Sequence, residues 1–130
     1  MSDRRVLVVD DEVHIVHVVA IKLRNNGYEV ISAENGADAF ELACSEKPDI
    51  IVTDFQMPVM NGLELVQKLR QTEQTKDIPV IMLTARGFAI EDDEKEGLAI
   101  SDFLSKPFSP KELLRSIDDI LYQRTVVQEN

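Results

Sequence analysis

The sequence predicts an α/β fold in which helices cover a parallel sheet. Short apolar runs rich in β-branched residues recur along the chain, and segments with helical periodicity separate them. Polar residues directly follow four of these runs, namely Asp10 with Asp11, Asp54, Thr84 and Lys106. Such alternation is typical of open parallel sheets, whose chemistry gathers at the carboxyl ends of the strands. We therefore expect these side chains to meet at one edge of the sheet.

Five elements are expected in the first half of the chain: strands at 4–9, 29–32 and 49–53, and helices at 13–26 and 37–45. The first helix is expected to be capped by Asp11 and to end at Gly27. It is rich in valine and isoleucine, which favour strands. We nevertheless predict a helix, because two parallel strands need a long crossover between them.

The second half is expected to contain a loop at 57–62, a helix with Leu65, Val66 and Leu69 inward, a strand at 80–83, a weak acidic helix near 91–96, a strand at 103–105 and a final helix. The final helix has the clearest signals, because Ser109 can cap it, Pro110 suits its first position and Glu112 completes a capping box. We expect one domain over residues 1–122 and a polar, frayed tail over 123–130.

Composition limits the classes of function. The chain has 130 residues, of which 44% are hydrophobic, and its formal net charge is −10. Nucleic-acid binding needs clustered basic side chains, so we expect no direct contact with DNA or RNA. The single cysteine, Cys44, fits a reducing cytoplasm, and no apolar stretch approaches the ~20 residues that span a bilayer. We predict a cytoplasmic protein without membrane contact.

Asp10, Asp11 and Asp54 form the predicted reactive centre. Two carboxylates ~4 Å apart repel by on the order of 4 kcal/mol near a protein surface. Three at one edge therefore need a cation or a bound proton, and an oxygen-rich site of this kind suits Mg²⁺. A carboxylate can also attack a phosphoryl group to form an acyl phosphate. Lys106 and Thr84 could contact the phosphoryl oxygens, and the bond from Lys106 to the following proline could be cis.

This set of residues resembles the receiver domain of bacterial two-component response regulators, over about residues 4–121. The resemblance implies a doubly wound, flavodoxin-like sheet of five parallel strands in the order 2-1-3-4-5. It implies that Asp54 is the phosphoacceptor. It also implies that Asp11, Asp54 and the backbone carbonyl of Gln56 bind Mg²⁺ directly, with Asp10 acting through water.

The resemblance further implies a signalling module rather than an enzyme with its own substrate. A sensor histidine kinase or a histidine phosphotransfer protein would phosphorylate Asp54, and the domain would catalyse this step and its own dephosphorylation. Lys106 would pair with the phosphoryl group and Thr84 would hydrogen-bond it, while Phe103 matches the aromatic residue that switches. The result would be a changed surface for a downstream effector, or a phosphorylation-dependent homodimer.

One departure from the family pattern and two variable positions are visible. Receivers often carry glycine at the position of Ala99, where an alanine is strained if φ is positive. Gln56 and Arg86 occupy positions that vary in the family. We hypothesise that Arg86 alters the lifetime of the phosphoaspartate, an idea that an unchanged dephosphorylation rate in Arg86→Ala would exclude.

Other readings of the sequence are possible. Asp10 and Asp11 could merely cap a helix, but the matching positions of Thr84 and Lys106 disfavour this. A haloacid-dehalogenase-type phosphatase would need a second acid where Gln56 stands, and no phosphate-binding glycine motif of nucleotide-binding folds occurs. A receiver-like scaffold with a vestigial pocket is the main structural alternative. His14 and His17 have too few companions for a metal site, although His14 could touch a docking partner.

Overall fold

The computed structural model describes residues 4–85 and 98–129, with side chains up to residue 123. Its strands are β1 (Arg5–Val9), β2 (Glu29–Ala33), β3 (Ile50–Asp54), β4 (Val80–Thr84) and β5 (Asp102–Ser105). Its helices in these ranges are α1 (Val13–Arg24), α2 (Gly36–Glu46), α3 (Gly62–Arg70) and α5 (Pro110–Glu129). The expected weak helix at 91–96 lies outside the described residues.

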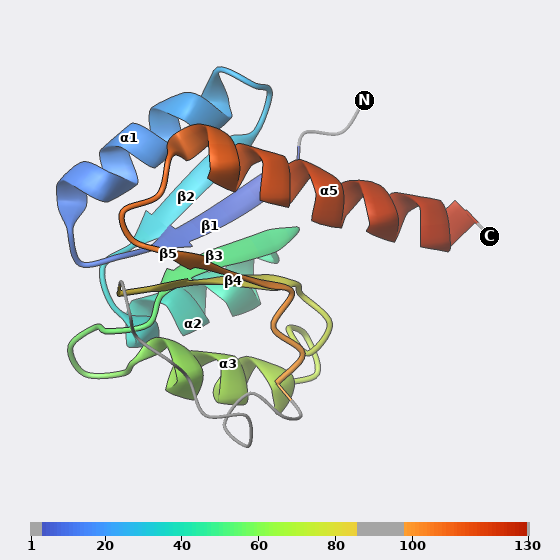
Figure 1. Cartoon of the computed structure of the whole chain (residues 1–130). Coiled ribbons are helices and arrows are strands. Elements are labelled where there is room, and N and C mark those ends of the chain that lie inside the picture. Colours follow the sequence, from blue (N-terminus) through green and yellow to red (C-terminus); the bar gives the residue numbers. More distant parts are fainter. Residues whose placement is uncertain (1–3, 86–97, 130) are drawn as a thin grey trace.

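The five strands form one parallel sheet in the order β2-β1-β3-β4-β5, which confirms the predicted fold class. Helices α1 and α5 cover one face of the sheet, and α2 and α3 cover the other (Figure 1). Because both faces are covered, the central strands can be apolar along their whole length. β3 and β4 are accordingly buried at every position.

Alternate residues of a strand supply two separate cores. Val6 and Val8 of β1 belong to the apolar cluster beneath α1 and α5. Leu7 and Val9 belong to the cluster beneath α2 and α3. This division follows from the twofold alternation of side chains along a strand.

Helix α1 forms as predicted despite its many β-branched residues, but the expected cap at Asp11 is wrong. The N-cap residue is Glu12, and its side chain makes no capping hydrogen bond. The backbone N–H of Glu12 instead donates to Oδ1 of Asp10 at 2.9 Å. The helix ends at Arg24, slightly before Gly27, whose φ of +90° turns the chain toward β2.

Helix α5 continues to Glu129, so the backbone of the polar segment 123–129 extends this helix. The Ser109 hydroxyl accepts from the backbone N–H of Glu112 at 3.0 Å, which is one bond of the predicted capping box. Leu113, Ile117 and Leu121 are buried against the sheet. The C-terminal part of the helix projects beyond the sheet (Figure 1).

At the amino ends of the strands, Arg5 joins three neighbouring segments. Its guanidinium lies 2.7 Å from Glu29 of β2 and 2.9 Å from Glu46 at the end of α2. Its backbone N–H donates to Oδ2 of Asp49, directly before β3, at 2.8 Å. One residue of β1 therefore links both neighbouring strands and a helix at this edge.

Two further observations concern the single cysteine and the possibility of a membrane-spanning helix. Cys44 is half-buried in α2 and forms no disulfide. Within residues 4–85 and 98–129, no helix is both long enough and apolar enough to cross a membrane.

Candidate functional site

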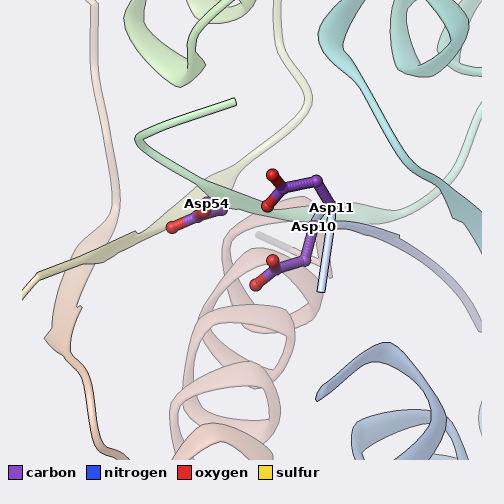
Figure 2. A group of neighbouring side chains, drawn as sticks. All are labelled: Asp10, Asp11 and Asp54. Carbon is purple, nitrogen blue, oxygen red and sulfur yellow. The ribbon is translucent and has the colours of Figure 1, made fainter. Parts of the chain in front are cut away.

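The three carboxylates of the predicted centre come together at the carboxyl edge of the sheet. Asp10 and Asp11 follow β1, and Asp54 ends the adjacent strand β3. One oxygen from each residue lies within 4.8 Å of the other two. Figure 2 shows the three carboxylates directed to the same side of the strand ends. Asp10 and Asp54 are buried and Asp11 is exposed, so the cluster has one face open to solvent.

Lys106 supplies the positive charge of this cluster. Its Nζ lies 2.9 Å from Oδ2 of Asp10 and 3.3 Å from Oδ1 of Asp54, and only 19% of its side chain is exposed. Its backbone N–H donates to the carbonyl of Thr84 at 2.7 Å, which ties the end of β5 to the end of β4. The bond from Lys106 to Pro107 is cis, as the sequence suggested.

The protonation of Asp54 reflects its surroundings. Burial, followed by the negative charge of Asp10, raises the pKa of Asp54 to about 6, although Lys106 partly opposes this. For Lys106 itself, burial alone would lower the pKa. Its hydrogen bonds to Asp10 and Glu12 outweigh burial, so the pKa of Lys106 is raised. A cation among the carboxylates would favour the ionised form of Asp54.

The other predicted site residues lie around this centre. Thr84 ends β4 and is buried. Phe103 lies in β5, half-buried against the apolar cluster beneath α2 and α3. Gln56 is exposed in the loop after β3. The structure therefore joins the carboxylates and Lys106 directly, with Thr84 on the adjoining strand, whereas a metal-binding role for Gln56 stays a prediction.

Glu12 is a member of the site that the sequence analysis missed. Its Oε1 accepts a hydrogen bond from Lys106 Nζ at 3.1 Å. The signal was present, since Glu12 directly follows Asp10 and Asp11 in the sequence. An acid at a helix start is also explained by the helix dipole, so its position in the sequence does not single it out as a site residue.

The loop between β3 and α3 is fixed by glycine and by a capping box. Asn61 and Glu64 each accept from the other's backbone N–H, at 2.8 and 3.0 Å. The backbone N–H of Gly62 donates to the carbonyl of Phe55 at 2.8 Å. A β-carbon at Gly62 would lie 2.6 Å from the carbonyl oxygen of Asp54, so only glycine fits without a shift of backbone.

Ala99 has the positive φ that was suspected, at +54°. Arg70 of α3 stabilises the turn around Ala99 by hydrogen bonds to backbone carbonyls. Its guanidinium donates to the carbonyls of Leu98 at 2.7 Å and Ala99 at 3.3 Å, and to that of Ile78 before β4 at 2.7 Å. Arg86, for which a role was hypothesised, lies outside the described residues.

A groove of about 500 Å³ opens beside the centre, between the start of α1 and the start of α5. Its wall includes Glu12, His14, Val18, Lys106 and Phe108. His14 is exposed there, as is His17 further along α1. In the described part of the chain, Asp10, Asp11 and Asp54 form the one group of three or more acidic, histidine or cysteine side chains close enough to share a metal ion.

The fold and the site together place the chain among doubly wound α/β domains that have an acidic site and a lysine at the carboxyl edge of the sheet. The family model for the response regulator receiver domain matches residues 6–118. The chain belongs to this family, as the resemblance implied, and is a receiver domain of the two-component response regulators.

Individual relatives agree. The chain is 41% identical to the phosphate regulon transcriptional regulatory protein PhoB of Pseudomonas aeruginosa, over 93% of this chain and 53% of the relative. It is 39% identical to the alkaline phosphatase synthesis transcriptional regulatory protein PhoP of Bacillus subtilis, over 92% and 49%. The chain thus spans about half the length of these curated relatives.

Among solved structures, the chemotaxis response regulator CheY4 of Vibrio cholerae superposes with a TM-score of 0.84 at 34% identity, covering 92% of this chain and 99% of CheY4. A receiver domain of a signal transduction histidine kinase from Syntrophus aciditrophicus gives a TM-score of 0.83 at 26% identity, covering 92% and 91%. The fold is therefore shared with a chemotaxis response regulator and with the receiver domain of a histidine kinase.

Proposed function

We propose that the chain is a phosphorylation-controlled signalling module in which Asp54 accepts a phosphoryl group from a histidine kinase or a histidine phosphotransfer protein. One observation carries the proposal. Asp54 is buried at a strand end, within 3.3 Å of Lys106 and beside Asp10 and Asp11. This arrangement offers a nucleophile, a cation for the incoming phosphoryl oxygens and ligands for a metal.

In the proposed reaction, a carboxylate oxygen of Asp54 attacks the phosphorus atom of a phosphohistidine. The new O–P bond forms as the P–N bond breaks, and the electron pair stays on the imidazole nitrogen. Lys106 donates to the phosphoryl oxygens, and the Thr84 hydroxyl hydrogen-bonds them. Water later attacks the phosphorus of the acyl phosphate, the O–P bond to Asp54 breaks, and inorganic phosphate leaves while Asp54 becomes a carboxylate again.

The donor set fits Mg²⁺, which prefers oxygen ligands and keeps several waters. Asp11, Asp54 and the carbonyl of Gln56 would hold the ion, and Asp10 would act through water. When bound, Mg²⁺ supplies positive charge that offsets repulsion between the Asp54 carboxylate and the phosphoryl oxygens.

The proposed output is a change of surface. A phosphoaspartate adds charge that draws Thr84 toward it, and Phe103 turns into the space that Thr84 leaves. Coupling of this kind is typically worth ~1–3 kcal/mol, enough to shift a population without a new fold. The changed face would include β5 and α5, where an effector or a second copy of the chain could bind.

We assign the phosphodonor protein to the groove beside Lys106, because His14 and Lys106 both line it and Nζ of Lys106 lies 3.3 Å from Asp54. The effector remains a protein or a further domain, and no direct contact with nucleic acid is proposed for this acidic chain. The proposed location is the cytoplasm, in keeping with the single cysteine.

The first test is intact mass after incubation with acetyl phosphate. The wild type and Asp54→Asn would each be measured with Mg²⁺ and with EDTA. We expect a single phosphoryl adduct, only in the wild type and only with Mg²⁺. No adduct, together with no Mg²⁺ binding in a titration, would favour the vestigial scaffold. Turnover of an added phosphoester would favour a phosphatase.

A further inference from the structure

We propose that Glu12 is a positioning residue that shares the ammonium group of Lys106 with the phosphorylation site and so limits how fast Asp54 is phosphorylated. The proposal rests on the function proposed above. It concerns a side chain that lies outside the metal-ligand set inferred for the site.

The first observation is the geometry of Lys106. An ammonium group has three N–H donors and no acceptor. Around Lys106 Nζ lie three carboxylate oxygens, at 2.9 Å from Asp10, 3.1 Å from Glu12 and 3.3 Å from Asp54. All three donors therefore have a carboxylate nearby, and the shortest distances are to Asp10 and Glu12 rather than to the phosphoacceptor.

The second observation is the placement of Glu12. It is the N-cap residue of α1, but its side chain does not cap the helix. Its backbone N–H is held by Oδ1 of Asp10, so the carboxylate starts from a fixed point beside the site. The side chain is about half exposed, and its other oxygen lies 3.9 Å from Nε2 of the exposed His14, so the carboxylate can turn toward solvent and release Lys106.

These observations predict a competition. When a phosphoryl group reaches Asp54, its oxygens and the carboxylate of Glu12 both attract Lys106. Replacing Glu12 by glutamine removes the charge and keeps the shape, so Lys106 should turn toward Asp54 more often. The strength of an exposed ion pair corresponds to about a two- to fivefold effect on the rate of phosphorylation.

The experiment compares Glu12→Gln with Glu34→Gln in rates of adduct formation from acetyl phosphate at saturating Mg²⁺. Glu34 follows β2 at the same edge, is exposed, and takes no part in the three ion pairs of Lys106. The control therefore removes the same charge without touching the lysine. We expect Glu12→Gln to be about two- to fivefold faster than Glu34→Gln.

A double-mutant cycle separates competition for Lys106 from a general effect of charge. In a Lys106→Ala background, Glu12→Gln and Glu34→Gln should have equal effects. A second readout needs no phosphoryl donor, namely Mg²⁺ affinity by calorimetry. Glu12→Gln should weaken Mg²⁺ binding more than Glu34→Gln does, because the released ammonium then competes with the ion for Asp10 and Asp54.

The outcomes are distinct. If the wild type forms no adduct, the proposed function fails and this inference fails with it. If the wild type is phosphorylated but Glu12→Gln matches Glu34→Gln in rate and in Mg²⁺ affinity, only the role of Glu12 is overturned. An excess effect that persists in the Lys106→Ala background also overturns it, since Glu12 would then act without the lysine.

Discussion

The carbonyl oxygen of Asp54 lies only 2.6 Å from the position that a β-carbon of Gly62 would occupy. The same β-carbon would be 2.7 Å from Sδ of Met82 in β4. The start of α3 is therefore packed directly against the backbone of the proposed phosphoacceptor. A glycine at this position determines how closely the helix approaches the site.

We predict that Gly62→Ala costs ~2 kcal/mol or more of unfolding free energy, because the backbone of Asp54 must move. It should also weaken Mg²⁺ binding by displacing Asp54. The control is Gly27→Ala, whose added β-carbon has no atom within 4 Å but whose φ of +90° strains an alanine, so it should lose stability without losing Mg²⁺ affinity. Urea unfolding and Mg²⁺ titration of both variants test this. An unchanged stability or an unchanged Mg²⁺ affinity in Gly62→Ala would show that the contact is easily relieved.

Asp54→Asn should stabilise the metal-free protein at neutral pH. The pKa of Asp54 is about 6 in the folded state against a reference of 3.8, so the folded state binds the proton more tightly. The resulting stability is present below pH 3.8 and is lost as pH rises through 6. Asparagine avoids this loss, and we expect a gain of ~1–3 kcal/mol at pH 8.

Chemical unfolding of Asp54→Asn and the wild type in EDTA, from pH 4 to pH 8, measures this difference. It should be small at pH 4 and grow through pH 6. Excess Mg²⁺ should reduce it, because the ion stabilises the wild type by binding the native state. A difference that does not change with pH would rule out the titration of Asp54 as its cause.

Lys106→Met should have opposite effects on stability and on metal binding. Without the ammonium, the fully buried carboxylate of Asp10 loses its cation, and we expect the metal-free protein to lose ~1–3 kcal/mol. The Mg²⁺ affinity should rise, because no internal cation competes for the carboxylates. Lys111→Met, at an exposed position of α5, is the control and should change neither property. A lower Mg²⁺ affinity in Lys106→Met would contradict the competition.

Ala99→Gly should stabilise the domain. A non-glycine residue at φ +54° carries backbone strain of ~1 kcal/mol, and glycine relieves it at some cost in chain entropy. We expect a net gain of about 0.5 kcal/mol. Ala37→Gly, in helix α2, should instead destabilise by ~1 kcal/mol. Urea unfolding of the two variants tests the sign, and a loss in Ala99→Gly would mean that Arg70 and its bonds already offset the strain.

Much of the fold could be predicted because local and topological signals agree. The apolar runs gave the strands, and the crossover requirement correctly gave α1 its helical form against the preference of Val18 and Val19 for strands. The N-cap at Glu12 could not be predicted, because the backbone N–H of Glu12 donates to Asp10 and this depends on the chain bending at the strand end.

The sequence predicted the three central carboxylates, but not the residues that contact them or support the neighbouring turn. Asp10, Asp11 and Asp54 follow strand ends, so the topology alone brings them together. The contact between Glu12 and Lys106 depends on the side-chain positions of two residues 94 positions apart, which no local pattern specifies. The hydrogen bond from Arg70 to the Ala99 carbonyl could not be predicted for the same reason, because the backbone carbonyls of a turn carry no sequence signal.

The ion pairs of Arg5 lie at the opposite end of the strands from Asp54. There, the guanidinium of Arg5 pairs with Glu29 and Glu46 and its backbone N–H donates to Asp49, whereas three carboxylates are crowded at the other edge. The ion pairs of Arg5 and the proposed phosphorylation site therefore lie at different ends of the same sheet. Substitutions around Arg5 could therefore raise or lower the stability of the domain without altering the proposed site at Asp54.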